Sequence, residues 1–192
     1  MSARAETFDS DELLALARLA LENNQIESAL EKLKKLIGDA NPPAESLALA
    51  ARVYAQLRLF GKSAQLYERY LEKHPNALLE RFQLGMTRFD AGQPAQALEV
   101  WETVLRTQPD YPPALFYKGL VLSQAGKAGE AKPLLEGLLK SVPADNFYFG
   151  RAKELIQAIE TGRVAQPPAK GGNGSDKPRK AAELPSAYRT EH

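Results

Sequence analysis

Apolar residues recur along this chain at the i, i+3, i+4 spacing of a helix that buries one face. The clearest run begins after the segment DAGQP (90–94) and consists of Ala97, Leu98, Trp101, Val104 and Leu105. Within DAGQP, Gly92 tolerates a tight turn and Pro94 suits the first turn of a helix, where its missing N–H is not needed. Another apolar run, with Leu84 and Phe89, precedes this segment. The stretch therefore predicts two helices joined by a short turn.

The same arrangement recurs every 34 residues. Pro75, Pro109 and Pro143 lie 34 residues apart, and Asn41 lies one step earlier. Small residues keep this register in both helices of a unit: Ala17, Ala51, Gly85 and Gly119, then Ala29, Ser63, Ala97 and Ala131. Bulky residues follow the second set: Leu33, Tyr67, Trp101 and Leu135. Small residues let helices approach closely and bulky ones fill the remaining space. We predict four helix–turn–helix units: 10–43, 44–77, 78–111 and 112–145.

Both ends of the predicted array carry terminating signals. After a short N-terminal extension (1–8), Asp9 and Glu12 fit a capping box at the start of the first helix. After the fourth unit, residues 146–162 have apolar residues on one face and charge on the other, which predicts a capping helix. Residues 163–192 are rich in Pro, Gly and charge, so we expect a disordered tail there.

This pattern resembles the tetratricopeptide repeat family, in which an apolar residue, Leu-Gly, Ala, an aromatic residue and Pro recur over 34 positions. The third unit matches best, with Leu84-Gly85, Gly92, Ala97, Trp101 and Pro109. The resemblance covers about four-fifths of the chain. It implies an all-α fold, a right-handed α-solenoid. Arg81, Arg88 and Lys118 depart from the pattern at usually apolar positions, and we expect their stems to pack while their charges reach water.

The resemblance also implies a binding surface, because positions 2, 5, 9 and 12 of each first helix line the inner wall on which similar proteins hold a peptide. The residues that we expect to bind a partner there are Leu79, Phe82, Met86, Phe89, Phe116 and Leu120, together with the basic Arg18 and Arg52. An apolar patch that a monomer has no need to expose indicates a binding site. The alternatives are packing of Phe89 and Phe116 against adjacent repeats and an ordinary i, i+4 ion pair between Arg18 and Glu22.

The residue inventory offers little for catalysis. The chain has no cysteine, which excludes disulfides, thiolate zinc sites and cysteine nucleophiles. Its two histidines are His74, next to Pro75 at a predicted helix end, and His192, the last residue. The repeats contain no second histidine and no cysteine that could share a metal ion with His74, and no nucleotide-binding motif is present. We therefore expect no enzymatic activity, no metal site and no cofactor.

The net charge and the N-terminal sequence limit the predicted location of the protein and the predicted class of its partner. The formal net charge is +1, from 25 basic and 24 acidic residues, which gives no reason to expect nucleic acid. The start MSARAETFDSDELL lacks the apolar core of a signal peptide, and no run reaches the length of a membrane span. We expect a cytoplasmic protein with a protein or peptide ligand and no membrane insertion.

Two functions from different classes fit these observations. The first is an adaptor or chaperone-like module that holds an apolar segment of a partner protein against the inner wall; bacterial chaperones of secreted translocators are similar in architecture. The second is a structural scaffold that self-associates through its end helices or its convex face. The sequence does not define the partner or the oligomeric state.

Overall fold

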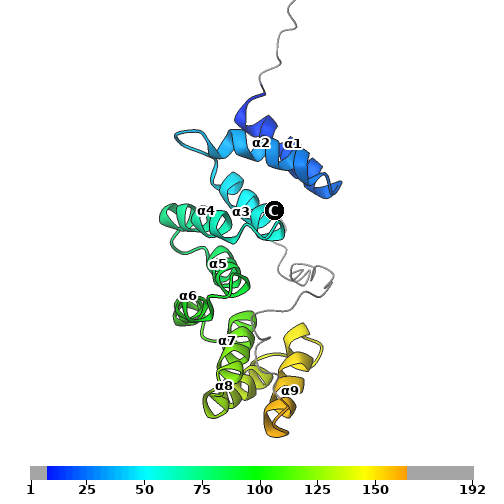
Figure 1. The fold of residues 1–192 in the computed structure, drawn as a ribbon, viewed down its shortest axis with the longest axis vertical. Coiled ribbons are helices and arrows are strands. Elements are labelled where there is room, and N and C mark those ends of the chain that lie inside the picture. Colours follow the sequence, from blue (N-terminus) through cyan, green and yellow to red (C-terminus); the bar gives the residue numbers. More distant parts are fainter. Residues whose placement is uncertain (1–7, 164–192) are drawn as a thin grey trace, which may run out of the picture. The chain divides into compact units, whose positions relative to one another are not determined.

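The computed structural model describes residues 8–163, and every regular element in this range is an α-helix (Figure 1). The helices are α1 (Ser10–Glu22), α2 (Ile26–Ile37), α3 (Ala44–Gln56), α4 (Phe60–Lys73), α5 (Leu78–Asp90), α6 (Pro94–Thr107), α7 (Pro112–Gln124), α8 (Ala128–Ser141) and α9 (Phe147–Glu160). The prediction of an all-α fold is confirmed. The predicted tail (163–192), except Arg163, and most of the N-terminal extension lie outside the described residues.

The 34-residue spacing extends to the backbone of the turns. The odd-numbered helices α1, α3, α5 and α7 begin at residues 10, 44, 78 and 112. Each is followed by one residue with positive φ, again at steps of 34: Asn24 (57°), Arg58 (58°), Gly92 (75°) and Gly126 (76°). The N–H of each donates to the carbonyl three residues earlier. One turn geometry therefore serves all four helix pairs, and at Arg58 it places a bulky side chain where glycine is favoured.

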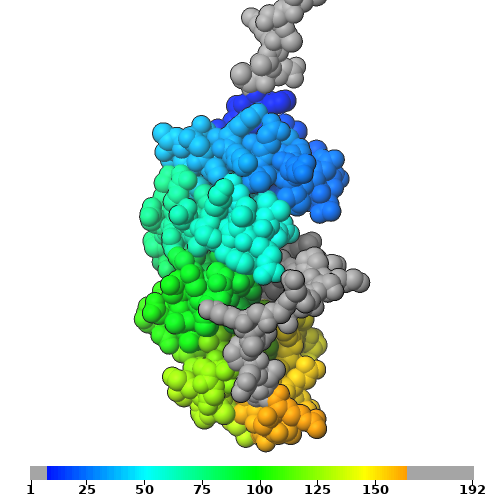
Figure 2. All heavy atoms as spheres, viewed as in Figure 1, coloured from blue at the N-terminus to red at the C-terminus, as the bar shows by residue number. Residues whose placement is uncertain are grey.

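The chain divides after Gln93 into two compact units. The first, called unit 1, contains α1 to α5, and each of these helices packs against the next along the chain. Figure 2 shows the side chains of α1 and α2 resting directly on those of α3 and α4. The small residues Ala17, Ala29 and Ala51 are completely buried, which allows close helix contact. Between α4 and α5, the buried hydroxyls of Ser63 and Thr87 form a hydrogen bond of 3.2 Å.

Unit 2 contains α6 to α9, and Trp101 of α6 is fully buried. The indole ring lies 5.7 Å from the ring of Tyr117 in α7, centroid to centroid. Gly119 of α7 faces Leu135 of α8 so closely that a Cβ atom on Gly119 would lie 2.8 Å from the Cδ2 atom of Leu135. The small residue at this position of the repeat is thus required by a close helix approach.

The two ends of the described chain are closed by local hydrogen bonds. The Asp9 side chain accepts from the N–H of Glu12 (2.8 Å), and the Glu12 carboxylate accepts from the N–H of Asp9 (2.9 Å), so the predicted capping box is confirmed. At the other end α9 packs against both α7 and α8. Its Glu160 accepts a hydrogen bond of 2.6 Å from Lys132 of α8, and Gly162 takes positive φ after the helix.

The three basic residues at usually apolar positions are half-buried with their charged ends satisfied, as expected from their long stems. Arg88 of α5 pairs with Glu68 of α4. Lys118 of α7 pairs with Glu102 of α6 at 3.2 Å. Arg81 donates to the backbone carbonyl of Pro75. Arg88 and Lys118 therefore join neighbouring helices within their units, and Arg81 joins α5 to the loop that precedes it.

Candidate functional site

The described residues offer surfaces rather than reactive clusters. None of them forms a group of three or more His, Asp or Glu side chains that could hold a metal ion. His74 ends α4, and its ring lies 4.8 Å from that of Tyr70. No helix in the described part of the chain is long and apolar enough to cross a membrane. The candidate sites are therefore the surfaces that positions 2, 5, 9 and 12 of the first helices form within each unit, which we call the inner stripe of that unit.

The inner stripe is less exposed than the sequence suggested. Phe82 of α5 is only 2% exposed and Phe116 of α7 only 3%. For Phe116 the cause is α9: the ring of Tyr148 lies 5.7 Å away, and the guanidinium carbon of Arg151 lies 4.8 Å from the Phe116 centroid. The expectation that these two rings form part of an exposed patch is wrong, because both are buried. For Phe116, the alternative of packing against neighbouring elements describes the structure.

The remaining apolar members of the stripe are half-buried. They are Leu79, Met86 and Phe89 of α5 in unit 1, and Leu120 of α7 in unit 2. Each leaves part of its side chain at the surface. The accessible apolar surface is thus smaller than expected and lies at positions 2, 9 and 12 rather than at position 5.

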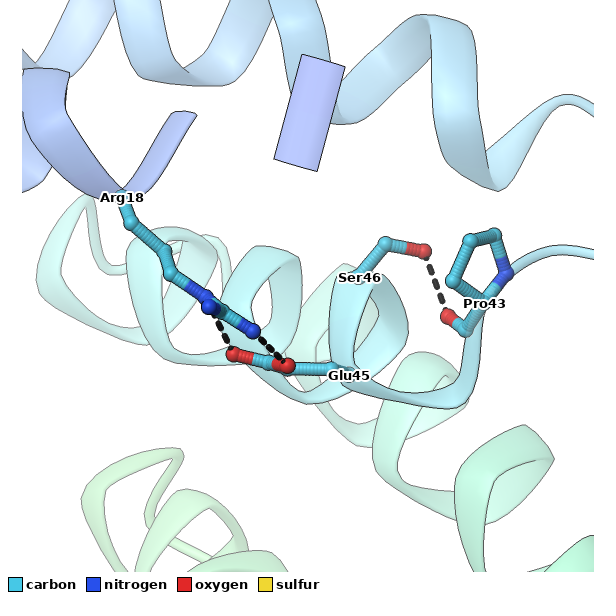
Figure 3. A network of polar contacts seen from close by, with 4 residues as sticks. All are labelled: Arg18, Pro43, Glu45 and Ser46. Carbon is cyan, nitrogen blue, oxygen red and sulfur yellow. Dashed lines mark hydrogen bonds and ion pairs between the residues drawn. The ribbon is translucent and has the colours of Figure 1, made fainter. Parts of the chain in front are cut away.

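Arg18 is held by a residue that the sequence analysis did not select (Figure 3). Its Nε donates to Oε1 of Glu45 at 2.7 Å, and its Nη2 donates to Oε2 of the same carboxylate. This pair, and not the i, i+4 pair with Glu22, occupies the guanidinium. The hydrogen bond to Glu45 raises the pKa of Arg18. Arg18 therefore links α1 to α3 instead of presenting a free charge.

The relation between these two positions was available from the sequence. Arg18 stands at position 9 of the first unit and Glu45 at position 2 of the second. The contact therefore joins position 9 of one repeat to position 2 of the next. Opposite charges at these two positions are the signal in the sequence for this contact.

Arg52 occupies the same position 9 one repeat later, but its surroundings differ. It is exposed and forms no ion pair with any residue in the described range. The residue one step of 34 after Glu45 is Leu79, which has no carboxylate. The charge of Arg52 affects Tyr67. Burial raises the pKa of the Tyr67 hydroxyl, and the positive charge of Arg52 offsets part of that rise. Unit 1 thus contains one satisfied arginine and one unsatisfied arginine at equivalent positions of its inner stripe.

Comparison with known proteins identifies the repeat. A family model described as tetratricopeptide repeat matches residues 14–77 and 82–146. The chain belongs to the tetratricopeptide repeat family. The resemblance found in the sequence is confirmed, and with it the all-α solenoid fold, which is that of a protein–protein interaction module.

Individual tetratricopeptide repeat relatives are distant. Protein CTR9 homolog from Arabidopsis thaliana is 27% identical over 172 residues, which cover 82% of this chain but only 16% of that protein. A tetratricopeptide repeat protein from Parabacteroides merdae superimposes with a TM-score of 0.70 at 18% identity, covering 80% of this chain and 60% of the other. MamA from Desulfovibrio magneticus gives 0.66 at 17% identity, covering 84% and 100%. At these identities the structural likeness shows the fold alone.

Proposed function

We propose that this protein is an adaptor or chaperone-like module, and that the inner stripe of unit 1 binds a partner segment carrying an acidic side chain beside apolar ones. The observation that carries the proposal is the contrast between Arg18 and Arg52. Both stand at position 9, but Glu45 satisfies only Arg18. A carboxylate from a partner would give Arg52 the contact that Arg18 already has within the chain.

The apolar members of the inner stripe on α5 favour a partner that is partly apolar. Leu79 and Met86 of α5 are half-buried, so a ligand can cover their remaining surface. A charge-assisted hydrogen bond contributes about 1.5–3 kcal/mol when water is excluded, but much less on an open surface. Apolar contact beside Arg52 would provide that exclusion. Acidic and apolar features are therefore expected in the same short segment.

The other candidate residues have supporting roles in this proposal. Phe82 and Phe116 hold their helices in place rather than touching the ligand, because both rings are buried. Phe89 extends the accessible apolar surface on α5. Leu120 offers a separate contact on the inner stripe of unit 2.

The proposal is tested by selecting peptides from a random display library on the full chain and, in parallel, on Arg52→Glu. Peptides selected by the natural chain should be enriched in Asp or Glu next to Leu, Ile, Met or Phe. Those selected by Arg52→Glu should lose the acidic residue, because the reversed charge repels it. Arg58→Glu is the matched control, since Arg58 is an exposed arginine in a turn. Equal acidic enrichment on all three proteins would contradict the proposal.

A further inference from the structure

The first helix exposes a face that is covered on the other first helices. At position 10, Val53 of α3, Thr87 of α5 and Val121 of α7 are 1%, 3% and 5% exposed. Leu19 stands at the same position of α1 and is 53% exposed. The difference has a simple cause: α1 and α2 form the end of unit 1, so no described helix precedes them (Figure 1).

The exposed face comprises more than one residue. We call it the outer face of α1; it consists of Glu12, Ala15, Leu16 and Leu19. The equivalent residues of α3 are Ser46, Leu49, Ala50 and Val53, which are all buried, and α3 packs against α2. Repeat arrays ordinarily close with a polar outer surface. The outer face of α1 instead has three apolar residues, as is typical of a surface that packs against another helix.

Charge around this face restricts what can cover it. Residues 9–22 contain four acidic side chains, Asp9, Asp11, Glu12 and Glu22, and one basic side chain, Arg18. The charge of Arg18 is already paired with Glu45. An apolar surface flanked by acidic groups is complementary to an apolar stripe flanked by Lys or Arg.

A second copy of α1 does not fit this description. In an antiparallel pair, Glu12 of one copy would approach Glu22 of the other, and in a parallel pair each of these residues would approach its own equivalent. Both arrangements bring like charges together without a compensating cation.

The packing of α2 on α3 shows how a helix can lie on the equivalent face of α1. Residues 38–43 lead from the end of α2 to the start of α3, so the last turn of α2 lies towards the start of α3. Lys34 and Lys35 of this turn are exposed, and Lys35 pairs with Glu31 of its own helix. A helix placed on α1 in the same way would bring its last turn to Asp11 and Glu12. Basic residues are favoured in that turn by the helix dipole as well as by these carboxylates.

We propose that the outer face of α1 is a docking site for a basic amphipathic helix of a partner protein, which lies on α1 as α2 lies on α3. The four residues of the outer face lie outside the inner stripe, although the flanking Asp11 occupies position 2, and the proposal does not depend on Arg52. The proposed module would then contact its partners through two surfaces, one for an acidic segment and one for a basic helix.

The test uses the full chain and a fluorescent synthetic peptide of residues 25–38, QIESALEKLKKLIG, followed by anisotropy. We expect saturable binding that Leu19→Lys weakens about tenfold or more, because it removes apolar contact and adds a like charge. Leu57→Lys is the matched control: Leu57 is 43% exposed but lies in the turn after α3, so the affinity should not change. A peptide with glutamine in place of Lys34 and Lys35 should bind more weakly.

Two further measurements separate the possible results. Leu19→Lys should keep the Tm of the natural chain, because the site is exposed and lysine is a good helix former. Arg52→Glu should leave the affinity for this peptide unchanged, so that failure of the inner-stripe proposal is recognised separately. No saturable binding up to about 1 mM peptide, or equal affinity for Leu19→Lys, would overturn the inference. A concentration-dependent dimer that Leu19→Lys abolishes would also overturn it, since a second copy would then be the occupant.

Discussion

Replacing Gly119 by alanine tests the closest helix contact of unit 2. A Cβ atom at this position would lie 2.8 Å from Cδ2 and 2.9 Å from Cγ of Leu135. Leu135 is completely buried, so its side chain cannot move into solvent to make room. The added methyl group must push α7 and α8 apart or force Leu135 out of its rotamer.

The magnitude follows from two opposing effects. Overpacking of this kind typically costs about 1–3 kcal/mol. Alanine is favoured over glycine in a helix by about 0.8–1.0 kcal/mol, which offsets part of that cost. Gly137 of α8 provides the control, because nothing lies within 4 Å of a Cβ atom there. Gly137→Ala should therefore stabilise by up to about 1 kcal/mol, and Gly119→Ala should be less stable than Gly137→Ala by about 1–3 kcal/mol.

Urea unfolding followed by far-ultraviolet circular dichroism measures this difference. The transition midpoint should rise for Gly137→Ala and lie clearly lower for Gly119→Ala, with similar slopes for both proteins. Equal midpoints would show that the helices do not approach as closely as the structure has them, and the structural reason for a small residue at this repeat position would be wrong.

Three other substitutions test separate parts of the fold. Trp101→Ala removes a fully buried side chain and should lower the free energy of unfolding by about 3–5 kcal/mol; an unchanged Tm would refute its role in the core. Arg58→Gly relieves a positive φ and should raise thermal stability by about 1 kcal/mol, whereas a loss would mean that the turn is not strained. Asp9→Ala breaks the capping box and should lower the free energy of unfolding in urea by about 1 kcal/mol. An unchanged free energy would show that the first turn of α1 is frayed in solution.

The sequence predicted the helices well because the repeat multiplies each local signal. A proline or small residue at one position is weak information, but prolines at three positions and small residues at four, all 34 residues apart, fix the register. Arg58 illustrates the strength of this spacing: its left-handed conformation follows from the register of Gly92 and Gly126, although arginine itself gives no such signal.

The surface was harder to predict because exposure depends on contacts between distant residues. Position 5 was correctly placed on one side of its helix, yet Phe116 is buried there by Tyr148 and Arg151 of α9. Glu45 differs, because its charge opposite to that of Arg18 is visible in the sequence, but which positions of successive repeats meet is visible only in the structure. The division after Gln93 also escaped prediction, since the repeat spacing continues through it unchanged.

The measurement that tests the central claim most directly is the affinity of one selected acidic and apolar peptide for the natural chain and for Leu79→Glu. That substitution places a carboxylate at the position that Glu45 occupies opposite Arg18, so it should pair with Arg52 within the chain. We predict that Leu79→Glu keeps or slightly raises the Tm while weakening peptide binding about tenfold, and that Leu79→Gln retains more of the affinity. Undiminished peptide binding by a folded Leu79→Glu protein would contradict the claim that Arg52 is the anchoring cation of the inner stripe.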